Sequence, residues 1–211
     1  EGGHTYRLTG QKWFCTSPMS DVFVVLAHAA RGITCFLVPR VLVDGGRNTW
    51  RLLRLKDKAG NRSSASAEVE LDGTWAVRLG EEGRGPRTVA GTISAIRLDA
   101  VLGAAGLMRH CVTRAVHHAR HREAFGSSLI DKPLMQNVLA DLALESEAAT
   151  TLAMRLAAAV DAGETELIRA AVPVAKFWVT KRATPVAAEA MECLGGNGYV
   201  EEHGLARVFR E

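Results

Sequence analysis

The sequence predicts an α+β protein with two domains, a small β-barrel or sandwich followed by an antiparallel helical bundle. Two contrasting patterns and a linker support this fold class. Residues 1–80 contain short apolar, β-branched runs separated by turn residues, whereas the later residues carry apolar side chains at helical spacing. Between them lies the glycine-rich, charged stretch GEEGRGPR, residues 80–87. We therefore expect a β domain over residues 1–85 and a helical domain over residues 86–211.

About five short strands are expected in the β domain. The segment TYRLTGQKWFCT alternates and is expected to turn at Thr9-Gly10. The runs VFVVLAHA and ITCFLVPR predict a hairpin through Ala30-Arg31-Gly32. Two further strands, NTWRLLRL and ASAEVELDG, are separated by a turn at Gly60-Asn61.

The first long helix is expected from about Ile93 to Arg122. Its buried face is predicted to carry apolar residues at helical spacing, namely Val101, Ala105, Met108, Val112, Ala115 and Ala119. The opposite face carries His110, Arg114, His117, His118 and His121. A pair of histidines four positions apart can bind a metal, but the surrounding arginines and the absence of a nearby carboxylate favour a solvated or anion-facing surface. We expect no metal site.

A second helix is expected to begin at DKPLMQ, with Asp131 as N-cap and Pro133 in the first turn, and to end at Gly163. Its apolar face is predicted to contain Leu134, Val138, Leu142, Leu152 and Leu156. A third helix, from Glu164 to Leu194, contains Pro173 and Pro185 and should be kinked or broken. Its apolar residues lie nearly all round, as expected for a helix buried between neighbours.

Composition excludes little. The chain of 211 residues has a formal net charge of +3, and it contains no Lys/Arg run of five or more that would indicate nucleic-acid binding. The four cysteines, Cys15, Cys35, Cys111 and Cys193, lack metal-ligand spacing and predict a reduced, cytoplasmic protein. No uninterrupted apolar run is long enough to span a bilayer. Because the chain begins without Met and ends in a helical pattern, we expect a fragment of a longer polypeptide.

The segment ECLGGNGYVEE, residues 192–202, contains three glycines in four positions. One glycine just past the end of a helix is a common stop signal, because glycine adopts the left-handed conformation at little cost. That explanation covers Gly195 or Gly196 but not all three glycines. The alternative is that a ligand approaches bare backbone at this turn.

Five segments, in this order, resemble the acyl-CoA dehydrogenase family. They are LTGQKWFCTSPMSDVFVVLA, LKDKAGNRSSASAEVELDG, IRLDAVLGAAGLM, HREAFGSSLIDKPLMQ and AMECLGGNGYVEE. The last is similar to the family element QxxGGxGY, with Glu192 in place of Gln. Within the family, the likeness is greatest to the AidB-type branch, which is associated with the adaptive response to alkylation and with DNA binding.

The resemblance implies an FAD-dependent oxidoreductase that dehydrogenates an acyl-CoA thioester at the α,β bond and passes hydride to flavin N5. It also implies a homotetramer with FAD at subunit interfaces and an electron-transfer acceptor. The AidB-type branch implies the alternative, a flavoprotein associated with double-stranded DNA that has weak or vestigial dehydrogenase activity.

The resemblance also assigns site residues. Trp13, Cys15, Thr16 and Ser17 would line the flavin ring. The FAD of the neighbouring subunit would be contacted by Arg122, Phe125, Gln136, Glu192, Gly195, Gly196 and Gly198. Arg97, with Asp99, would lie near the thioester of the substrate, although a surface arginine paired with Asp99 explains it equally well.

No catalytic base is expected in this chain. The family's general base is a glutamate at one of two places. One immediately precedes the arginine matched by Arg97, and Ile96 occupies it here. The other lies beyond Glu211. We therefore predict that these 211 residues alone are catalytically inactive.

Overall fold

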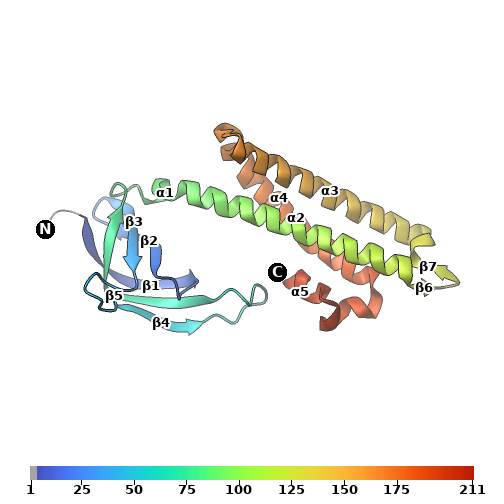
Figure 1. The fold of residues 1–211 in the computed structure, drawn as a ribbon, viewed down its shortest axis with the longest axis horizontal. Helices are drawn as coiled ribbons and strands as arrows, with labels where there is room; N and C mark the ends of the chain where they lie inside the picture. The colour runs from blue at the N-terminus through green and yellow to red at the C-terminus, as the bar shows by residue number, and fades with distance from the viewer. Residues whose placement is uncertain (1–3) are drawn as a thin grey trace. The chain divides into compact units, whose positions relative to one another are not determined.

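The computed structural model describes residues 4–211, and the chain divides into two compact units between Gly91 and Thr92. The first unit is a β domain and the second is helical, so the predicted α+β class is confirmed (Figure 1). The boundary predicted after residue 85 lies a few residues before this division.

The first unit is built on one curled antiparallel sheet (Figure 1). Its strands run in the order β1-β5-β3-β2, and β4 pairs with β5 beside this path. The strands are β1 (Thr5–Thr16), β2 (Val22–Ala29), β3 (Gly32–Pro39), β4 (Trp50–Leu55) and β5 (Ser66–Leu79). A single helical turn, α1 (Gly85–Thr88), follows the sheet.

The long strand β5 organises the sheet. It pairs with β1 from Thr5↔Val77 to Thr16↔Ser66, with β4 along its first half, and with β3 near its end. The turn predicted at Thr9-Gly10 is wrong. A register shift between Leu8 and Gly10 forms a bulge instead, so β1 continues to Thr16. An extra residue in one strand bends the chain without ending the pairing.

The predicted hairpin is confirmed: β2 and β3 pair from Val22↔Pro39 to Ala29↔Gly32, which leaves Ala30 and Arg31 as a two-residue loop. The core of this unit includes the fully buried Phe36, Val38 and Val69. Beside it Phe23 stacks on Trp50, with ring centroids 3.8 Å apart and planes inclined by 11°.

Three long antiparallel helices make up most of the second unit (Figure 1). They are α2 (Ala90–His121), α3 (Pro133–Asp161) and α4 (Thr165–Cys193). A small hairpin of β6 (Glu123–Ala124) and β7 (Ser127–Ser128), with the 3-10 turn η1 (Leu129–Asp131), joins α2 to α3. After α4 come the 3-10 segments η2 (Gly195–Tyr199) and η3 (Glu201–His203), and the short helix α5 (Leu205–Arg210).

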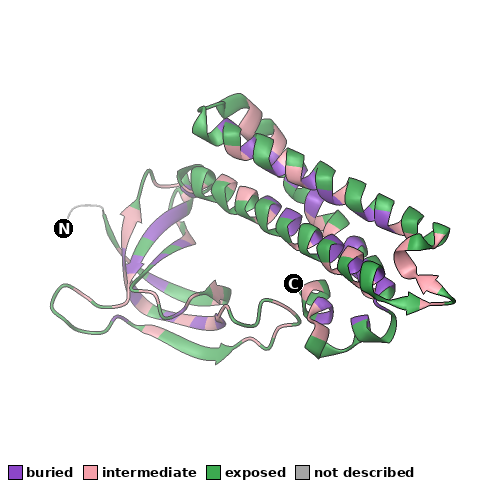
Figure 2. Ribbon diagram, turned by 45° about the vertical axis from the view of Figure 1, so that its right-hand side comes forward, coloured by how far each residue is buried: buried purple, intermediate pink, exposed green. Residues whose placement is uncertain are grey.

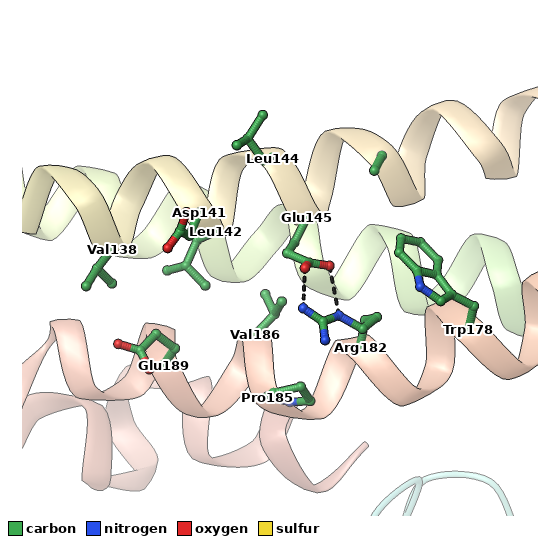
Figure 3. A pocket seen from close by; sticks show the side chains of 11 residues that line it. Val138, Asp141, Leu142, Leu144, Glu145, Trp178, Arg182, Pro185, Val186 and Glu189 are labelled. Carbon is green, nitrogen blue, oxygen red and sulfur yellow. Dashed lines mark hydrogen bonds and ion pairs between the residues drawn. The ribbon is translucent and has the colours of Figure 1, made fainter.

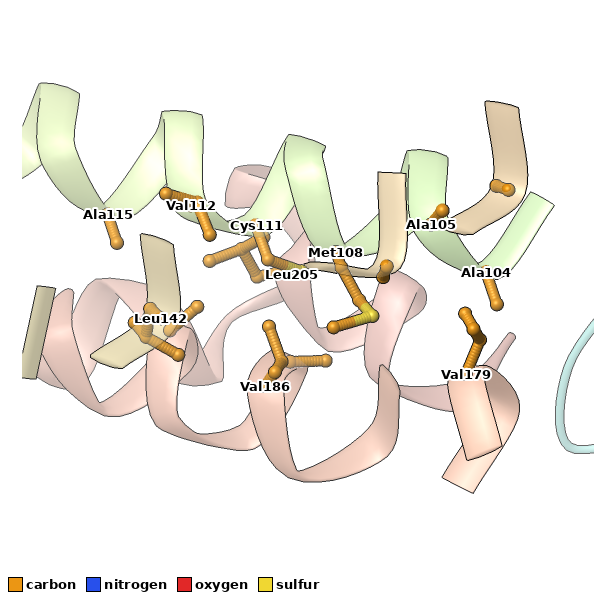
Figure 4. Packing of buried hydrophobic residues seen from close by; sticks show 14 of the residues in the cluster. Ala104, Ala105, Met108, Cys111, Val112, Ala115, Leu142, Val179, Val186 and Leu205 are labelled. Carbon is orange, nitrogen blue, oxygen red and sulfur yellow. The ribbon is translucent and has the colours of Figure 1, made fainter. Parts of the chain in front are cut away.

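The helices pack through small and branched apolar side chains (Figure 4). Met108 of α2, Leu156 of α3 and Leu205 of α5 are almost completely buried. Many of the other buried positions are alanines, which allow the helix backbones to approach closely. Every residue predicted for the buried face of α2 is buried, and Figure 2 shows the buried residues facing inwards between the helices.

Several helical predictions need correction. Leu134, expected on the buried face of α3, is 81% exposed because it lies in the first turn, before the helix packs against its neighbours. The N-cap of α3 is Lys132 rather than Asp131, which lies in η1. Pro133 is in the first turn, as predicted.

The third helix also differs from the prediction. α4 is one unbroken helix through Pro173 and Pro185, both on its exposed side. Buried residues on the other side, among them Val172, Ala175, Val179, Val186 and Ala190, hold it against the core and offset the lost backbone hydrogen bonds. Its apolar residues are not all buried, since Val174 and Phe177 are exposed.

By length and composition α2 is apolar enough to cross a membrane, with a mean hydropathy of 1.3 over 18 residues. The prediction that no apolar segment is long enough to span a bilayer was therefore too strict. The charged residues Arg97 and Asp99 do not lower the mean hydropathy of α2 enough to exclude it. One such helix is weak evidence for a membrane span, because core helices of soluble proteins have the same composition. The C-terminal half of α2 packs against α3 and α4 in the core.

Candidate functional site

The three glycines after α4 have three different surroundings. Gly195 has φ +59° directly after the C-cap Leu194, so it ends the helix in the left-handed conformation. Gly198 is buried against the helix end: a Cβ there would lie 2.7 Å from the carbonyl carbon of Met191. No atom of the described residues lies within 4 Å of a Cβ added to Gly195 or Gly196. Gly195 and Gly196 are therefore open on this side, and of the three glycines Gly198 is the one packed against the helix.

At the far end of α2 a tight hairpin displays Phe125. Phe125 and Gly126 both have positive φ, +53° and +82°, as a two-residue type I′ turn requires. Lys132 Nζ donates a hydrogen bond to the Phe125 carbonyl oxygen at 2.8 Å, and Leu129 N donates to the Arg122 carbonyl oxygen at 2.9 Å. The Phe125 side chain is 93% exposed. An exposed aromatic residue held in a strained conformation is typical of a binding position.

A basic cavity of about 300 Å³, here called the histidine pocket, lies where α2 ends beside the glycine turn. From α2 and the residue after it, the lining residues are Arg114, His117, His118, His121 and Arg122. Leu194, Asn197 and His203 line the other side. The pocket thus brings Arg122 together with the turn that contains the three glycines. Asn197 and His203 were not predicted, although both flank motif residues in the sequence.

The other two residues assigned to this region lie apart from the pocket lining. Gln136 is exposed in the first turn of α3, and its Nε2 donates a hydrogen bond to the Ile130 carbonyl oxygen at 3.0 Å. Glu192 is exposed in the last turn of α4. An exposed carboxylate there is positioned to accept hydrogen bonds or to pair with an arginine, rather than to lie against a phosphate.

In the first unit, the residues assigned to the flavin ring cluster at the end of β1. A register shift in β1 between Lys12 and Cys15 leaves Trp13 64% exposed. The Lys56 ammonium lies 3.0 Å from the centroid of the Trp13 ring, a cation–π contact. Ser17 has φ +53°, and its N–H donates to the Ala65 carbonyl oxygen at 2.9 Å.

Cys15 and Thr16 line a cavity of about 440 Å³, together with Phe14, Phe23 and Trp50. Burial raises the pKa of the Cys15 thiol. Trp13 and Ser17 do not line this cavity, so it holds two of the four residues assigned to the flavin ring. Its aromatic walls suit a planar ring, and Thr16 supplies a hydroxyl.

The residues assigned to the substrate lie on the N-terminal half of α2. Ile96, Arg97 and Asp99 are all exposed. Since positions two apart on a helix do not face each other, Arg97 and Asp99 point to different sides. Ile96 is an exposed aliphatic side chain without a titratable group, so it takes up no proton.

A larger cavity, of about 660 Å³, was not predicted. It lies between α3 and α4, and Figure 3 shows Val138, Leu144 and Trp178 around it. An ion pair between Arg182 and Glu145 bridges the two helices. None of the residues assigned from the sequence lines it. The apolar residues all round α4 could have indicated this cavity, but they were interpreted as evidence that the helix is completely buried.

No group of three His, Cys, Asp or Glu side chains in residues 4–211 is arranged to hold a metal ion. The neighbouring rings of His117 and His121, with centroids 4.3 Å apart and planes inclined by 38°, therefore lack a third ligand within this part of the chain. His121 Nδ1 instead bonds the His117 carbonyl oxygen at 2.8 Å. The lining of the pocket contains two arginines and no carboxylate.

Comparison with known proteins assigns the chain. The profile of the acyl-CoA dehydrogenase C-terminal domain matches residues 83–211. AidB of Escherichia coli (strain K12) is 48% identical over 98% of the chain and 39% of its own length. The mitochondrial isovaleryl-CoA dehydrogenase of Oryza sativa subsp. japonica is 30% identical over 100% of the chain and 52% of its own length. The crystal structure of Caenorhabditis elegans ACDH-11 in complex with C11-CoA matches with a TM-score of 0.89 and 30% identity, over 100% of the chain and 38% of that structure.

These matches, with a curled sheet followed by an antiparallel helical unit, define a chain of the flavoprotein dehydrogenase class. More specifically, the chain belongs to the acyl-CoA dehydrogenase family, whose members are FAD-dependent oxidoreductases. It spans between about two fifths and one half of the length of the relatives named here.

Proposed function

We propose that the protein to which this chain belongs is an FAD-dependent dehydrogenase that oxidises an acyl-CoA thioester at the α,β bond. The observation that carries this proposal is the match of residues 83–211 to the family profile, together with the open, basic glycine turn within those residues. The structurally similar ACDH-11 was crystallised in complex with C11-CoA, which supports a fatty acyl-CoA as the class of substrate.

The residues near the glycine turn fit the diphosphate part of FAD. Arg122 carries a planar, permanently charged guanidinium, which suits phosphate oxygens. Gly196 leaves its backbone accessible, and Gly195 and Gly198 fix the shape of the turn. Phe125, exposed at the hairpin tip, offers a face for packing against the cofactor. Gln136 and Glu192 would complete this site through hydrogen bonds to ribose or to neighbouring donors.

The residues at the end of β1 fit the flavin ring. Cys15 and Thr16 line a cavity with aromatic walls. Trp13 and Ser17 lie within two positions of them in the sequence. FAD bound there would supply an acceptor for the hydride taken from the substrate. The chain's own part is to orient the ring and to place hydrogen-bond donors at its edge. Arg97, exposed on α2, would then orient the thioester of the substrate, and Asp99 would assist.

The proton at the α-carbon needs a base that residues 4–211 do not supply at the expected position. Ile96 occupies one of the two family positions and cannot accept a proton. We therefore place the base glutamate beyond Glu211. On this proposal the isolated 211-residue chain does not turn over any acyl-CoA.

We also propose that the full-length protein is a homotetramer that passes electrons to a separate electron-transfer acceptor. The exposed apolar residues of the helical unit support assembly. They include Leu144, Met154, Val174, Phe177 and Trp178 on α3 and α4. Large apolar side chains on adjacent helix surfaces are typical of protein–protein interfaces.

A reducing, cytoplasmic location is proposed from the thiols. All four cysteines are free in the structure: Cys35, Cys111 and Cys193 are buried, and Cys15 is half-buried. A protein that keeps four unpaired thiols suits a compartment in which disulfides do not persist.

A second function, association with double-stranded DNA in the alkylation response, is favoured by the 48% identity to AidB. The basic side chains of α2 give it a further basis, since Arg109, Arg114 and Arg120 lie along the helix near the histidine pocket. Binding through phosphates weakens steeply with salt. A retention assay of full-length protein with duplex DNA at low and high salt tests it, and no retention at low salt would remove this candidate.

The decisive test of the first function is an anaerobic titration of full-length protein, followed by visible absorption. We expect a flavin spectrum that is bleached by isovaleryl-CoA or by a longer acyl-CoA and restored by an electron acceptor. A flavin spectrum that no thioester reduces would leave FAD binding intact but reject dehydrogenation. A colourless protein that takes up no FAD would reject the flavoprotein assignment.

A further inference from the structure

Besides Arg122, the histidine pocket is lined by several other basic side chains. Arg114 provides a second permanent charge, and four histidines share the lining with the amide of Asn197. Among the residues that the structure places around this pocket, none is a carboxylate. Like charges gathered in one concave site attract an anion, because a cavity focuses their field.

The concentration of positive charge affects the pKa of His118. Burial lowers the pKa of the His118 imidazole, and repulsion from Arg122, His203 and His117 lowers it further. The remaining basic groups of the lining, Arg114 and His121, add to the same field. Without a counter-charge, a proton on His118 is therefore disfavoured. An anion in the pocket reverses this balance, because a nearby negative charge stabilises the imidazolium form.

The end of α2 is prepared for such an anion in spite of its helix dipole. The C-terminus of a helix carries partial negative charge on its free carbonyl groups, which repels anions. Here the His117 carbonyl oxygen accepts from His121 Nδ1 at 2.8 Å, and the His118 carbonyl oxygen accepts from Arg122 N at 2.8 Å. The permanent charges of Arg114 and Arg122, which line the pocket, oppose the partial negative charge of this helix end.

The opposite wall supplies neutral donors. Asn197 lines the pocket between Gly196 and Gly198, and its side-chain amide can donate two hydrogen bonds. Gly196 leaves its backbone open beside it. His203 reaches the same cavity from η3, the 3-10 segment after the glycine turn. The pocket thus joins charged and neutral donors from three elements around one anion-sized space.

We propose that His118, His203 and Arg114, together with Arg122, hold the diphosphate of the flavin nucleotide, and that this binding is coupled to the uptake of a proton by His118. The proposal rests on the proposed function, because it names further residues and a proton linkage for the same cofactor. It adds binding residues outside the family motif. The diphosphate keeps a constant charge near neutral pH, so the titrating groups belong to the protein.

The sign of the linkage follows from the shift on binding. An anion raises the pKa of His118 in the complex above its value in the free protein. The extra affinity is therefore fully present below the free-state pKa and is lost as the pH rises through the pKa of the complex. FAD should bind more tightly in mildly acidic than in mildly alkaline solution.

The test measures FAD binding to flavin-free, full-length protein across this range by flavin fluorescence and calorimetry. We expect the Kd to weaken about fivefold or more between about pH 6 and pH 8, given up to tenfold per pH unit for each proton coupled. Calorimetry in two non-phosphate buffers of different ionisation enthalpy should show net proton uptake.

Matched variants separate the pocket from a general effect of histidine. His118→Gln should flatten the pH dependence and reduce proton uptake, while His110→Gln should change neither. His203→Gln removes a pocket donor and should weaken FAD binding. His110 lies exposed on the same helix, outside the pocket. Circular dichroism shows which variants fold. If a variant does not fold, the pH profile of FAD binding to the wild-type protein still tests the proposal.

The outcomes are distinguishable. FAD binding that is independent of pH and involves no proton uptake would overturn this inference and leave the proposed function standing. Equal pH dependence in all three variants would also overturn it. A protein that binds no FAD at any pH would reject the proposed function, and this inference with it.

Discussion

Gly198 packs directly against the backbone of Met191, so the turn after α4 folds back onto the helix that it ends. The contact explains why this position needs glycine even though its neighbour Gly196 faces open space. Two glycines of one motif thus have different surroundings, one packed against the helix and one open.

Gly198→Ala should destabilise the protein. A methyl group there overlaps the Met191 carbonyl group, and such overpacking costs about 1–3 kcal/mol of unfolding free energy. Thermal and urea unfolding measure it. Gly196→Ala is the matched control and should unfold like the wild type while binding FAD more weakly. Equal stability of the two variants would show that the turn can move away from α4.

Met108→Ala should be among the more damaging substitutions in the helical unit. Met108 is 1% exposed at the centre of the cluster of α2, α3, α4 and α5, and truncating such a side chain costs about 2–5 kcal/mol. Met154→Ala, at a position 59% exposed, should change the unfolding free energy by less than about 0.5 kcal/mol. Similar losses in both variants would contradict the observed packing.

Glu68 should make the β domain sensitive to acid. Hydrogen bonds from Arg54 and Lys56 lower the pKa of the Glu68 carboxyl to about 2. A depressed pKa stabilises the folded state above the unfolded-state pKa, and this stabilisation is lost as the pH falls from about 4.5 towards 2. Carboxyl titration by NMR should give a midpoint near 2, raised in Arg54→Gln. Stability of Glu68→Gln should depend less on pH in this window.

The thiols should differ in reactivity. Burial raises the pKa of Cys111 and of Cys193 to about 11, and Cys35 is fully buried. Cys15 is only half-buried. Iodoacetamide at mildly alkaline pH should therefore modify Cys15 first in the native protein, since the thiolate is the reacting form and must be accessible. Mass spectrometry should find one adduct before unfolding and four in urea. A native adduct that persists in Cys15→Ser would contradict this order.

The sequence predicted best the elements whose cause is local. Helical spacing identified the buried face of α2 from Val101 to Ala119, and the short Ala30-Arg31 loop identified the hairpin of β2 and β3. Of the predicted kink or break at Pro173 and Pro185, the break is wrong, because the packing of α4 outweighs their local preference. The bulge at Leu8–Gly10 was read as a turn, since glycine marks both features and only the pairing with β5 distinguishes them.

Other features depend on contacts between distant positions. Nothing local in the sequence shows that β5 pairs with three strands, or that Gly198 touches Met191. At the histidine pocket, the sequence identified Arg122 through a family motif and His118 through helical spacing. Asn197 and His203 enter the pocket only through the fold of η2 and η3. All the cofactor and substrate assignments stay predictions, those of Arg122, Phe125 and the three glycines as much as those of Trp13 and Arg97.

The central position of β5 has a consequence for the order of events during synthesis. Thr5 pairs with Val77, so β1, the first of these five strands to be synthesised, waits for β5, the last of them, before it finds its partner. Until then β1 and β4 have exposed, unpaired edges, and only the hairpin of β2 and β3 can close early. Pairing between strands so far apart in the sequence is slow, because the entropy cost of closing the loop comes before the stabilising contacts form. Within residues 4–211, the nascent β domain is therefore the part that chaperones should contact first.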